Sequence, residues 1–219
     1  MAEDFEAVCK KFRVTSAIVL GWSLGGMWLR LEWPGAKSDG YFRAFFSDLV
    51  NFASSVDITG FINVAGPPYI DQDLFARVAR PATLGILAAL SQPPSVDVFQ
   101  ENALNLVHLF SEVISHDLFC TLLEGVIIQP RAVTAQVVSR KQDPTKLLQE
   151  GRDGKMEVLV VTGGKDSLVS APGLRAVYEE MGWKKCTVKH LDEADHMPWV
   201  SRGDEFREII LGWIKGGRM

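Results

Sequence analysis

The sequence has no strong excess of charge of either sign, which limits the partners it can have. It contains 27 acidic and 23 basic residues, for a formal net charge of −4, and no segment forms a basic stripe. Proteins that bind nucleic acid concentrate lysine and arginine on one face, so we expect no nucleic-acid partner. The charged fraction of 23% and the hydrophobic fraction of 47% are ordinary for a globular protein.

Long apolar runs and paired cysteines are also missing. No run reaches the roughly 18 residues that a membrane span needs, and Met1-Ala2-Glu3-Asp4 lacks the parts of a secretory signal. The three cysteines, Cys9, Cys120 and Cys186, are far apart and form no C-x-x-C pair. That spacing argues against a disulfide framework or a zinc site. We therefore expect a soluble, cytoplasmic protein.

Short apolar runs alternate with helical periodicity along the 219 residues, a length typical of one large domain. The predicted strands are 17–20, 58–64, 158–161 and 186–191. The predicted flanking helices are 3–12, 42–49, 174–181 with Gly182 as the C-terminal cap, and 206–214. This order predicts an α/β fold with a mostly parallel sheet and crossover connections.

Residues 69–153 have a different pattern, which is helical and has no strand alternation of useful length. Such a segment between two strands of a sheet predicts a helical cap, inserted into the fold, rather than a separate domain. The predicted core then consists of residues 1–68 and 154–219.

The segment Gly21-Trp22-Ser23-Leu24-Gly25-Gly26 directly follows the first predicted strand. A serine with glycine two residues away on each side, at the end of a strand, is typical of a nucleophile elbow, where the chain turns sharply into a helix. Gly21 and Gly25 lack the Cβ that would collide with the strained serine backbone. The backbone N–H of Leu24 could then face a developing oxyanion. A plain strand with a glycine-rich turn fits the same residues.

A serine hydroxyl is a weak nucleophile until a base accepts its proton, and the base needs a carboxylate that fixes its tautomer. Asp166 and His196 each follow a predicted strand, so both are expected at the sheet edge that carries Ser23. Asp192 and Asp195 are rival acids, but a carboxylate so close in sequence to the histidine reaches its far ring nitrogen with difficulty. This favours Asp166 as the acid.

Simpler roles remain open for these residues. An aspartate after Gly-Gly-Lys is often only a turn former, and His196 also fits a loop histidine with a local hydrogen bond. The other histidines, His108, His116 and His190, lie within the helical insertion or a strand. For these three we expect packed or solvated positions rather than catalysis.

The order serine, aspartate, histidine differs from the orders in chymotrypsin-type and subtilisin-type enzymes. With three motifs in matching contexts, the chain resembles the lid-bearing α/β-hydrolases of the esterase, lipase and haloperoxidase-like kind. The motifs are the elbow at 21–26, an acid loop at 160–166 and a histidine loop at 195–199. The resemblance covers nearly the whole chain and implies Ser23 as nucleophile, Asp166 as orienting acid and His196 as general base. It implies no metal and no organic cofactor.

The chain departs from that family in three places. Asp195 stands where the family has glycine, and the interrupted stretch Glu32–Tyr41 stands where it has a continuous helix. That stretch is either a genuine insertion or an error in the gene model. The sequence also starts at the helix before the elbow, so the resemblance implies a partial fold, without the first strands and the second oxyanion donor. Strand 17–20 would then be an uncovered edge through which chains could self-associate.

These observations predict a serine hydrolase that cleaves an ester or related acyl bond in a small, mostly apolar substrate. The same three residues also serve cofactor-free perhydrolysis and carbon–carbon bond hydrolysis, and the sequence does not separate these reactions. The alternative from another class is a catalytically silent, truncated hydrolase or binding module. It would keep the topology without a complete oxyanion hole.

Overall fold

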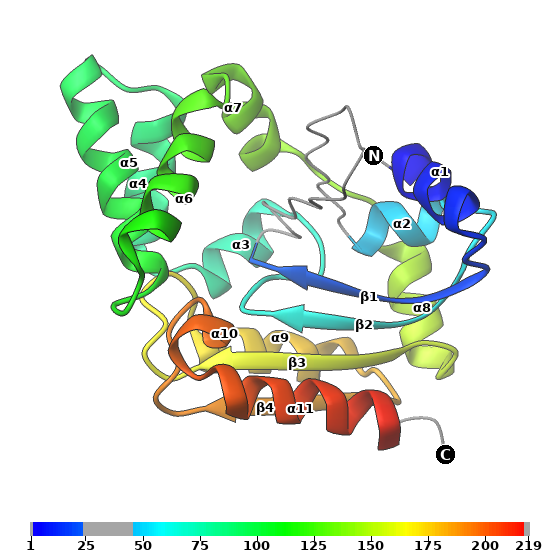
Figure 1. Ribbon diagram of the computed structural model, residues 1–219. Helices are drawn as coiled ribbons and strands as arrows, with labels where there is room; N and C mark the ends of the chain where they lie inside the picture. Colours follow the sequence, from blue (N-terminus) through cyan, green and yellow to red (C-terminus); the bar gives the residue numbers. More distant parts are fainter. Residues whose placement is uncertain (1, 24–45, 217–219) are drawn as a thin grey trace.

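The computed structural model describes residues 2–23 and 46–216, and in this part of the chain four strands form one parallel sheet (Figure 1). The strands are β1 (Ser16–Trp22), β2 (Asp57–Val64), β3 (Glu157–Gly163) and β4 (Cys186–Leu191), in the spatial order β1-β2-β3-β4. Neighbouring parallel strands need crossover connections, and helices lie between all of them in the sequence. The four predicted strands are therefore confirmed.

Eleven helices lie in the described ranges. They are α1 (Ala2–Phe12), α2 (Phe46–Phe52), α3 (Gln72–Val78), α4 (Pro81–Ser91), α5 (Val96–Phe110), α6 (His116–Ile128), α7 (Arg131–Ser139), α8 (Thr145–Asp153), α9 (Ala171–Met181), α10 (Pro198–Ser201) and α11 (Gly203–Gly216). Gly182 ends α9 with a left-handed φ of 67°, which confirms the predicted cap. The hydroxyls of Ser95 and Ser115 accept backbone N–H groups at the starts of α5 and α6.

Alternate residues of β2 face opposite sides of the sheet, and each side packs against different helices. The ring of Phe61 contacts Phe46 of α2, with ring centroids 4.1 Å apart, and Asn63 on the same side reaches Tyr178 of α9. Gly60 faces the other side, where Trp213 of α11 approaches it. Helices α9 and α11 thus lie on opposite faces of the sheet (Figure 1).

The core is centred on β3. Residues 158–161 are completely buried, as expected for a strand covered on both faces. The outer strand β1 is less covered, since Ile18, Val19 and Leu20 are only half-buried. Helix α11 is also at the surface and contains no buried residue. Within the described residues β1 pairs with β2 alone. Self-association through this strand remains a prediction.

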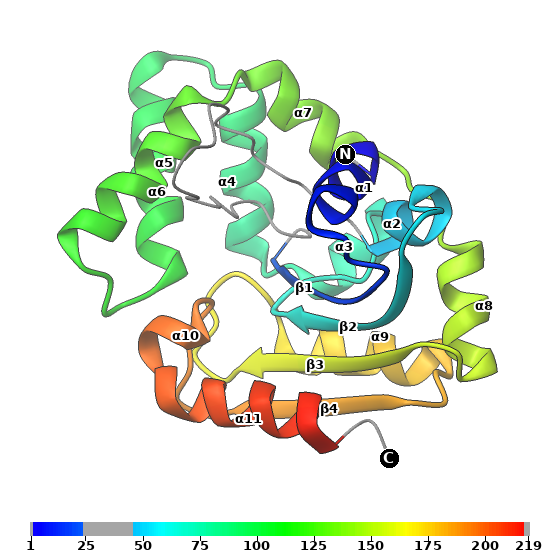
Figure 2. The same cartoon turned by 45° about the vertical axis from the view of Figure 1, so that its right-hand side comes forward.

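Helices α4, α5 and α6 gather beyond the C-terminal ends of the strands, whereas α8 lies beside the sheet (Figures 1 and 2). Helix α8 packs on α2, and α3 packs on α9. The division into a core and a cap at 69–153 remains a prediction. Among the described helices, none is both long and apolar enough to cross a membrane.

Candidate active site

Ser23 follows β1 directly, and its backbone has the geometry of a sharp turn. Its φ is 56°, in the left-handed region that residues with a Cβ rarely adopt. The Ser23 N–H donates a hydrogen bond of 2.8 Å to the carbonyl oxygen of Val64 at the end of β2. This hydrogen bond links Ser23 to the neighbouring strand β2, so contacts with β2 stabilise the strained turn.

Gly21 and Gly66 both allow close packing around this turn. A Cβ on Gly21 would lie 2.9 Å from the ring of Phe46, so this glycine makes room for an aromatic side chain of α2. A Cβ on Gly66 would lie 1.7 Å from the carbonyl oxygen of Ser23, where no side chain fits. Leu24, Gly25 and the stretch 32–41 lie outside the described residues.

Asn63, Gly66 and Tyr178 form a hydrogen-bonded group next to the turn at Ser23. The buried side-chain amide of Asn63 donates a hydrogen bond of 2.6 Å to the Gly66 carbonyl oxygen and another to the Tyr178 hydroxyl. Burial raises the pKa of Tyr178 far above its usual value, so the hydroxyl stays neutral. Sequence reasoning missed these residues, although an asparagine inside an apolar strand just before Ala-Gly-Pro-Pro is a signal that could have found them.

Replacing Gly66 with alanine is expected to displace the turn at Ser23 and to lower the free energy of unfolding by about 1–3 kcal/mol, because the added methyl overlaps the Ser23 carbonyl. Thermal and urea unfolding measure this loss. Gly85→Ala is the matched control, since a Cβ on this α4 residue meets nothing within 4 Å. The control is expected to stabilise the helix by up to about 1 kcal/mol. Equal stability of the two variants would contradict the role of Gly66.

His196 lies in the loop after β4, and its side chain is completely buried. Its Nε2 is 2.8 Å from the Oγ of Ser23, and its Nδ1 is 2.9 Å from Oδ2 of Asp166. The ring of Phe110 stacks on the imidazole with centroids 5.8 Å apart, and the Trp22 indole N–H donates to the His196 carbonyl oxygen over 2.7 Å. The ring orientation is therefore fixed by packing and by hydrogen bonds at both nitrogens.

Asp166 lies just past β3 and is 2% exposed. Its Oδ1 accepts the backbone N–H groups of Leu168 and Val169 at 2.8 and 2.9 Å, which leaves Oδ2 to face His196. The side chain of Arg80 donates to the backbone carbonyl of Asp166 over 2.7 Å. These bonds hold the carboxylate in one orientation.

The two rival acids lie in other environments. Asp195 is buried, with Oδ2 accepting the Ser111 hydroxyl at 2.7 Å and Oδ1 accepting the Met197 N–H and the Ser201 hydroxyl, both at 2.9 Å. It therefore braces the loop that carries His196. Asp192 is 92% exposed and lies 3.5 Å from Nε2 of His190.

The other histidines lie apart from the Ser23 hydroxyl. His190 is in β4, where its Nδ1 is 2.8 Å from the Thr162 hydroxyl. His108 of α5 and His116 of α6 are exposed. Within the described ranges, no three histidine, cysteine, aspartate or glutamate side chains converge so that they could hold a metal ion.

A small cavity of about 30 Å³ adjoins Ser23. Its lining is otherwise almost entirely apolar and includes Phe75, Leu87, Leu106 and Phe110 from helices α3, α4 and α5. The polar exception, Thr83, donates its hydroxyl proton to the Leu168 carbonyl oxygen over 2.7 Å. The space in front of Ser23 therefore suits a small uncharged group.

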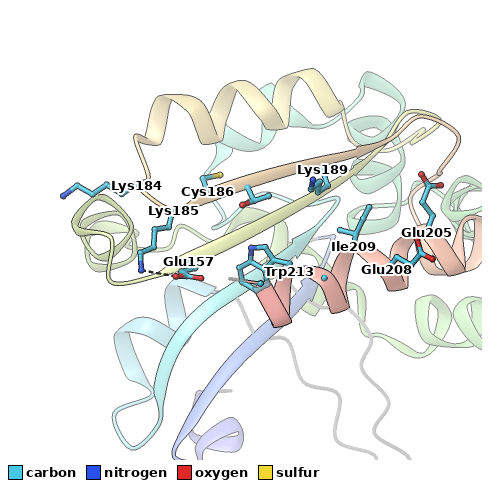
Figure 3. Close-up of a pocket in the computed structure, with 12 residues that line it drawn as sticks. Glu157, Lys184, Lys185, Cys186, Lys189, Glu205, Glu208, Ile209 and Trp213 are labelled. Carbon is cyan, nitrogen blue, oxygen red and sulfur yellow. Dashed lines mark hydrogen bonds and ion pairs between the residues drawn. The ribbon is translucent and has the colours of Figure 1, made fainter. Parts of the chain in front are cut away.

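A much larger hollow, of about 1000 Å³, lies between β4 and α11 (Figure 3). Its lining carries both signs of charge, with Lys185 paired to Glu157 over 3.0 Å. It includes residues from the starts of β3 and β4, the end of the sheet opposite Ser23, and no serine or histidine. This hollow is separate from the site around His196.

Comparisons with known proteins define the fold. No protein-family model matches the sequence, and no curated protein matches it. Among solved structures, an esterase from a Rhodococcus species superposes with a TM-score of 0.75 at 20% identity, over 98% of this chain and 71% of that one. The esterase EaEST from Exiguobacterium antarcticum has a TM-score of 0.64 at 14% identity, over 99% and 73%.

A bromoperoxidase from Bacillus anthracis is also similar, with a TM-score of 0.66 at 12% identity, over 98% of this chain and 72% of that one. At these identities the similarity defines the fold, which is that of the α/β-hydrolases. The predicted fold class is thereby confirmed.

Proposed function

We propose that the protein is a serine hydrolase that cleaves an ester or related acyl bond in a small, mostly apolar substrate. The observation that supports this most is the hydrogen-bonded row from Ser23 through His196 to Asp166, with separations of 2.8 and 2.9 Å. The φ of 56° at the serine adds support, since strained backbone is typical of a nucleophile elbow. In this proposal Ser23 is the nucleophile, His196 the general base and Asp166 the orienting acid.

The reaction has two halves that use the same base. Nε2 of His196 accepts the hydroxyl proton as Oγ of Ser23 attacks the substrate carbonyl carbon, and the imidazolium then donates that proton to the leaving alcohol. Water attacks the acyl-enzyme in the second half, again with His196 accepting and returning a proton. Asp166 stabilises the imidazolium and keeps the proton of the resting imidazole on Nδ1.

The negative charge on the tetrahedral intermediate requires hydrogen-bond donors. We assign this role to the backbone N–H of Leu24, with Gly21 and Gly25 as the elbow glycines; Leu24 and Gly25 lie outside the described residues. The segment 69–153 would act as the cap over the core formed by 1–68 and 154–219. Its α4 and α5 contribute Leu87, Leu106 and Phe110 to the apolar lining at Ser23.

A fluorophosphonate tests this proposal because it reacts with activated serines and mimics the tetrahedral intermediate. We expect the intact protein to gain the mass of one phosphonyl group, which peptide mapping places on Ser23. Ser23→Ala should gain no mass, and His196→Ala should react far more slowly. An unlabelled wild-type protein would favour the catalytically silent alternative, and labelling elsewhere would contradict the assignment of the nucleophile.

A further inference from the structure

A groove of about 530 Å³ runs between α3, α4 and α7, helices that both ribbon views draw close together (Figures 1 and 2). None of the described residues that line it carries a charge. Six of the ten described lining residues are apolar, among them Leu84 and Ala88 of α4, and the other four are uncharged polar residues: Gln72, Ser91, Gln92 and Ser139. An uncharged groove of this kind disfavours ionic groups and favours a hydrocarbon chain.

Two side chains connect this groove to the site. Phe75 of α3 and Leu87 of α4 line both the groove and the small cavity at Ser23. Since each contacts both spaces, together they form the wall between them. Leu87 is 7% exposed, whereas Phe75 is half-buried and borders the open groove.

The two volumes suit different parts of one molecule. The cavity of about 30 Å³ holds little more than one or two water molecules or a short group beside the Ser23 hydroxyl. A longer aliphatic chain attached to a carbonyl at Ser23 must continue past the wall. The groove of about 530 Å³ lies directly behind that wall.

We propose that this groove binds the aliphatic chain of the substrate, so that the preferred substrates are uncharged esters with a chain of medium length. Phe75 and Leu87 move aside to admit the chain while the carbonyl group stays at Ser23. The inference rests on the proposed function, because the comparison of esters requires that the protein hydrolyses them. The chain can come from the acyl or the alcohol side of the ester, and the substrates below distinguish these sources.

The first measurement is binding without catalysis. p-Nitrophenyl octyl ether carries the chain and has no cleavable ester, and its affinity for the 219-residue protein is measured by calorimetry. Ala88→Trp fills the groove and is expected to weaken binding at least about tenfold, because each buried methylene contributes about fourfold. Ala82→Trp, at an exposed α4 residue outside the groove lining, is the matched control and should bind as the wild type does.

The second measurement compares kcat/KM for four esters, in two pairs that each differ only in chain length. For Ala88→Trp we expect the octanoate-to-acetate ratio of p-nitrophenyl esters to fall at least about tenfold if the groove takes the acyl chain. If the groove takes the alcohol chain, the ratio of kcat/KM for octyl acetate to kcat/KM for ethyl acetate falls instead. Phe75→Ala opens the wall and should raise whichever of these two kcat/KM ratios Ala88→Trp lowers.

The outcomes separate the two proposals. Ether binding that Ala88→Trp weakens, without any ester hydrolysis, supports the groove and contradicts the hydrolase. Ser23-dependent acetate hydrolysis with both ratios and ether binding unchanged in Ala88→Trp contradicts the groove alone. No ether binding to the wild type, or equal losses in Ala82→Trp and Ala88→Trp, also overturns the groove.

Discussion

Ser23→Ala is expected to lower kcat for p-nitrophenyl acetate on the order of 10⁶-fold, the effect that loss of a triad nucleophile has in a serine hydrolase. We expect the variant to keep the fold, because among the described residues the Ser23 hydroxyl is bonded to the His196 imidazole and otherwise borders a small cavity. Removing the hydroxyl leaves His196 with no proton to accept. Steady-state release of nitrophenol by purified wild type and variant measures the change.

His196→Ala and the double variant with Ser23→Ala are the companions to this experiment. Residues that act as one unit lose activity together, so the double variant should be about as slow as either single variant. Multiplied losses would show that the two side chains work independently. Turnover that persists in Ser23→Ala would contradict the assignment of the nucleophile. Circular dichroism of each variant checks that it is folded.

Asp166→Asn should lower kcat about 10⁴-fold while leaving the fold intact. The amide oxygen of asparagine can still accept the N–H groups of Leu168 and Val169, so the loop keeps its anchor. The amide NH₂ would then face Nδ1 of His196 and favour the tautomer that carries its proton on Nε2. That tautomer cannot accept the Ser23 proton. The kcat of p-nitrophenyl acetate hydrolysis and the melting temperature are measured together.

Asp195→Asn is the matched control, because it makes the same change in a buried aspartate next to the histidine. Here one amide group replaces a carboxylate that accepts from Ser111, Met197 and Ser201. We expect a loss of about 1–3 kcal/mol in stability, with most of kcat retained in the folded protein. The opposite pattern, with kcat lost in Asp195→Asn and kept in Asp166→Asn, would assign the orienting carboxylate to Asp195.

Local patterns in the sequence were sufficient to place the four strands and the helices that flank the sheet, whereas residues 69–153 were predicted only as one helical segment. The four apolar residues at 158–161 predicted a buried strand, and β3 is buried throughout that stretch. The spacing of Leu174, Val177 and Tyr178 predicted one helix face, and all three side chains are buried in α9. Such patterns can be read because helices and strands repeat their buried positions at fixed intervals of 3.6 and 2 residues.

The sharp turn at Ser23 could also be anticipated, because its constraint is local. A serine forced into a left-handed turn needs small neighbours within two residues, and those neighbours are visible in the sequence. The reason for Gly21, however, is contact with Phe46, 25 positions away, which no short motif contains. Gly66 was missed for the same reason, since a Cβ there would overlap the carbonyl oxygen of Ser23, 43 positions earlier in the chain. The role of Asn63 likewise depends on a distant residue, because its amide donates to the Tyr178 hydroxyl of α9.

The sequence by itself determined the order of the elements, and it determined that Ser23, Asp166 and His196 follow strands that share one sheet edge. Only the tertiary structure decided which carboxylate faces the imidazole. Asp195 is adjacent to His196 in sequence, yet its oxygens are bonded to Ser111, Met197 and Ser201, whereas Asp166, 30 positions away, lies 2.9 Å from Nδ1. The orientation of each carboxylate follows from hydrogen bonds between segments that meet only when the chain folds, so it cannot be predicted from the spacing of residues in the sequence.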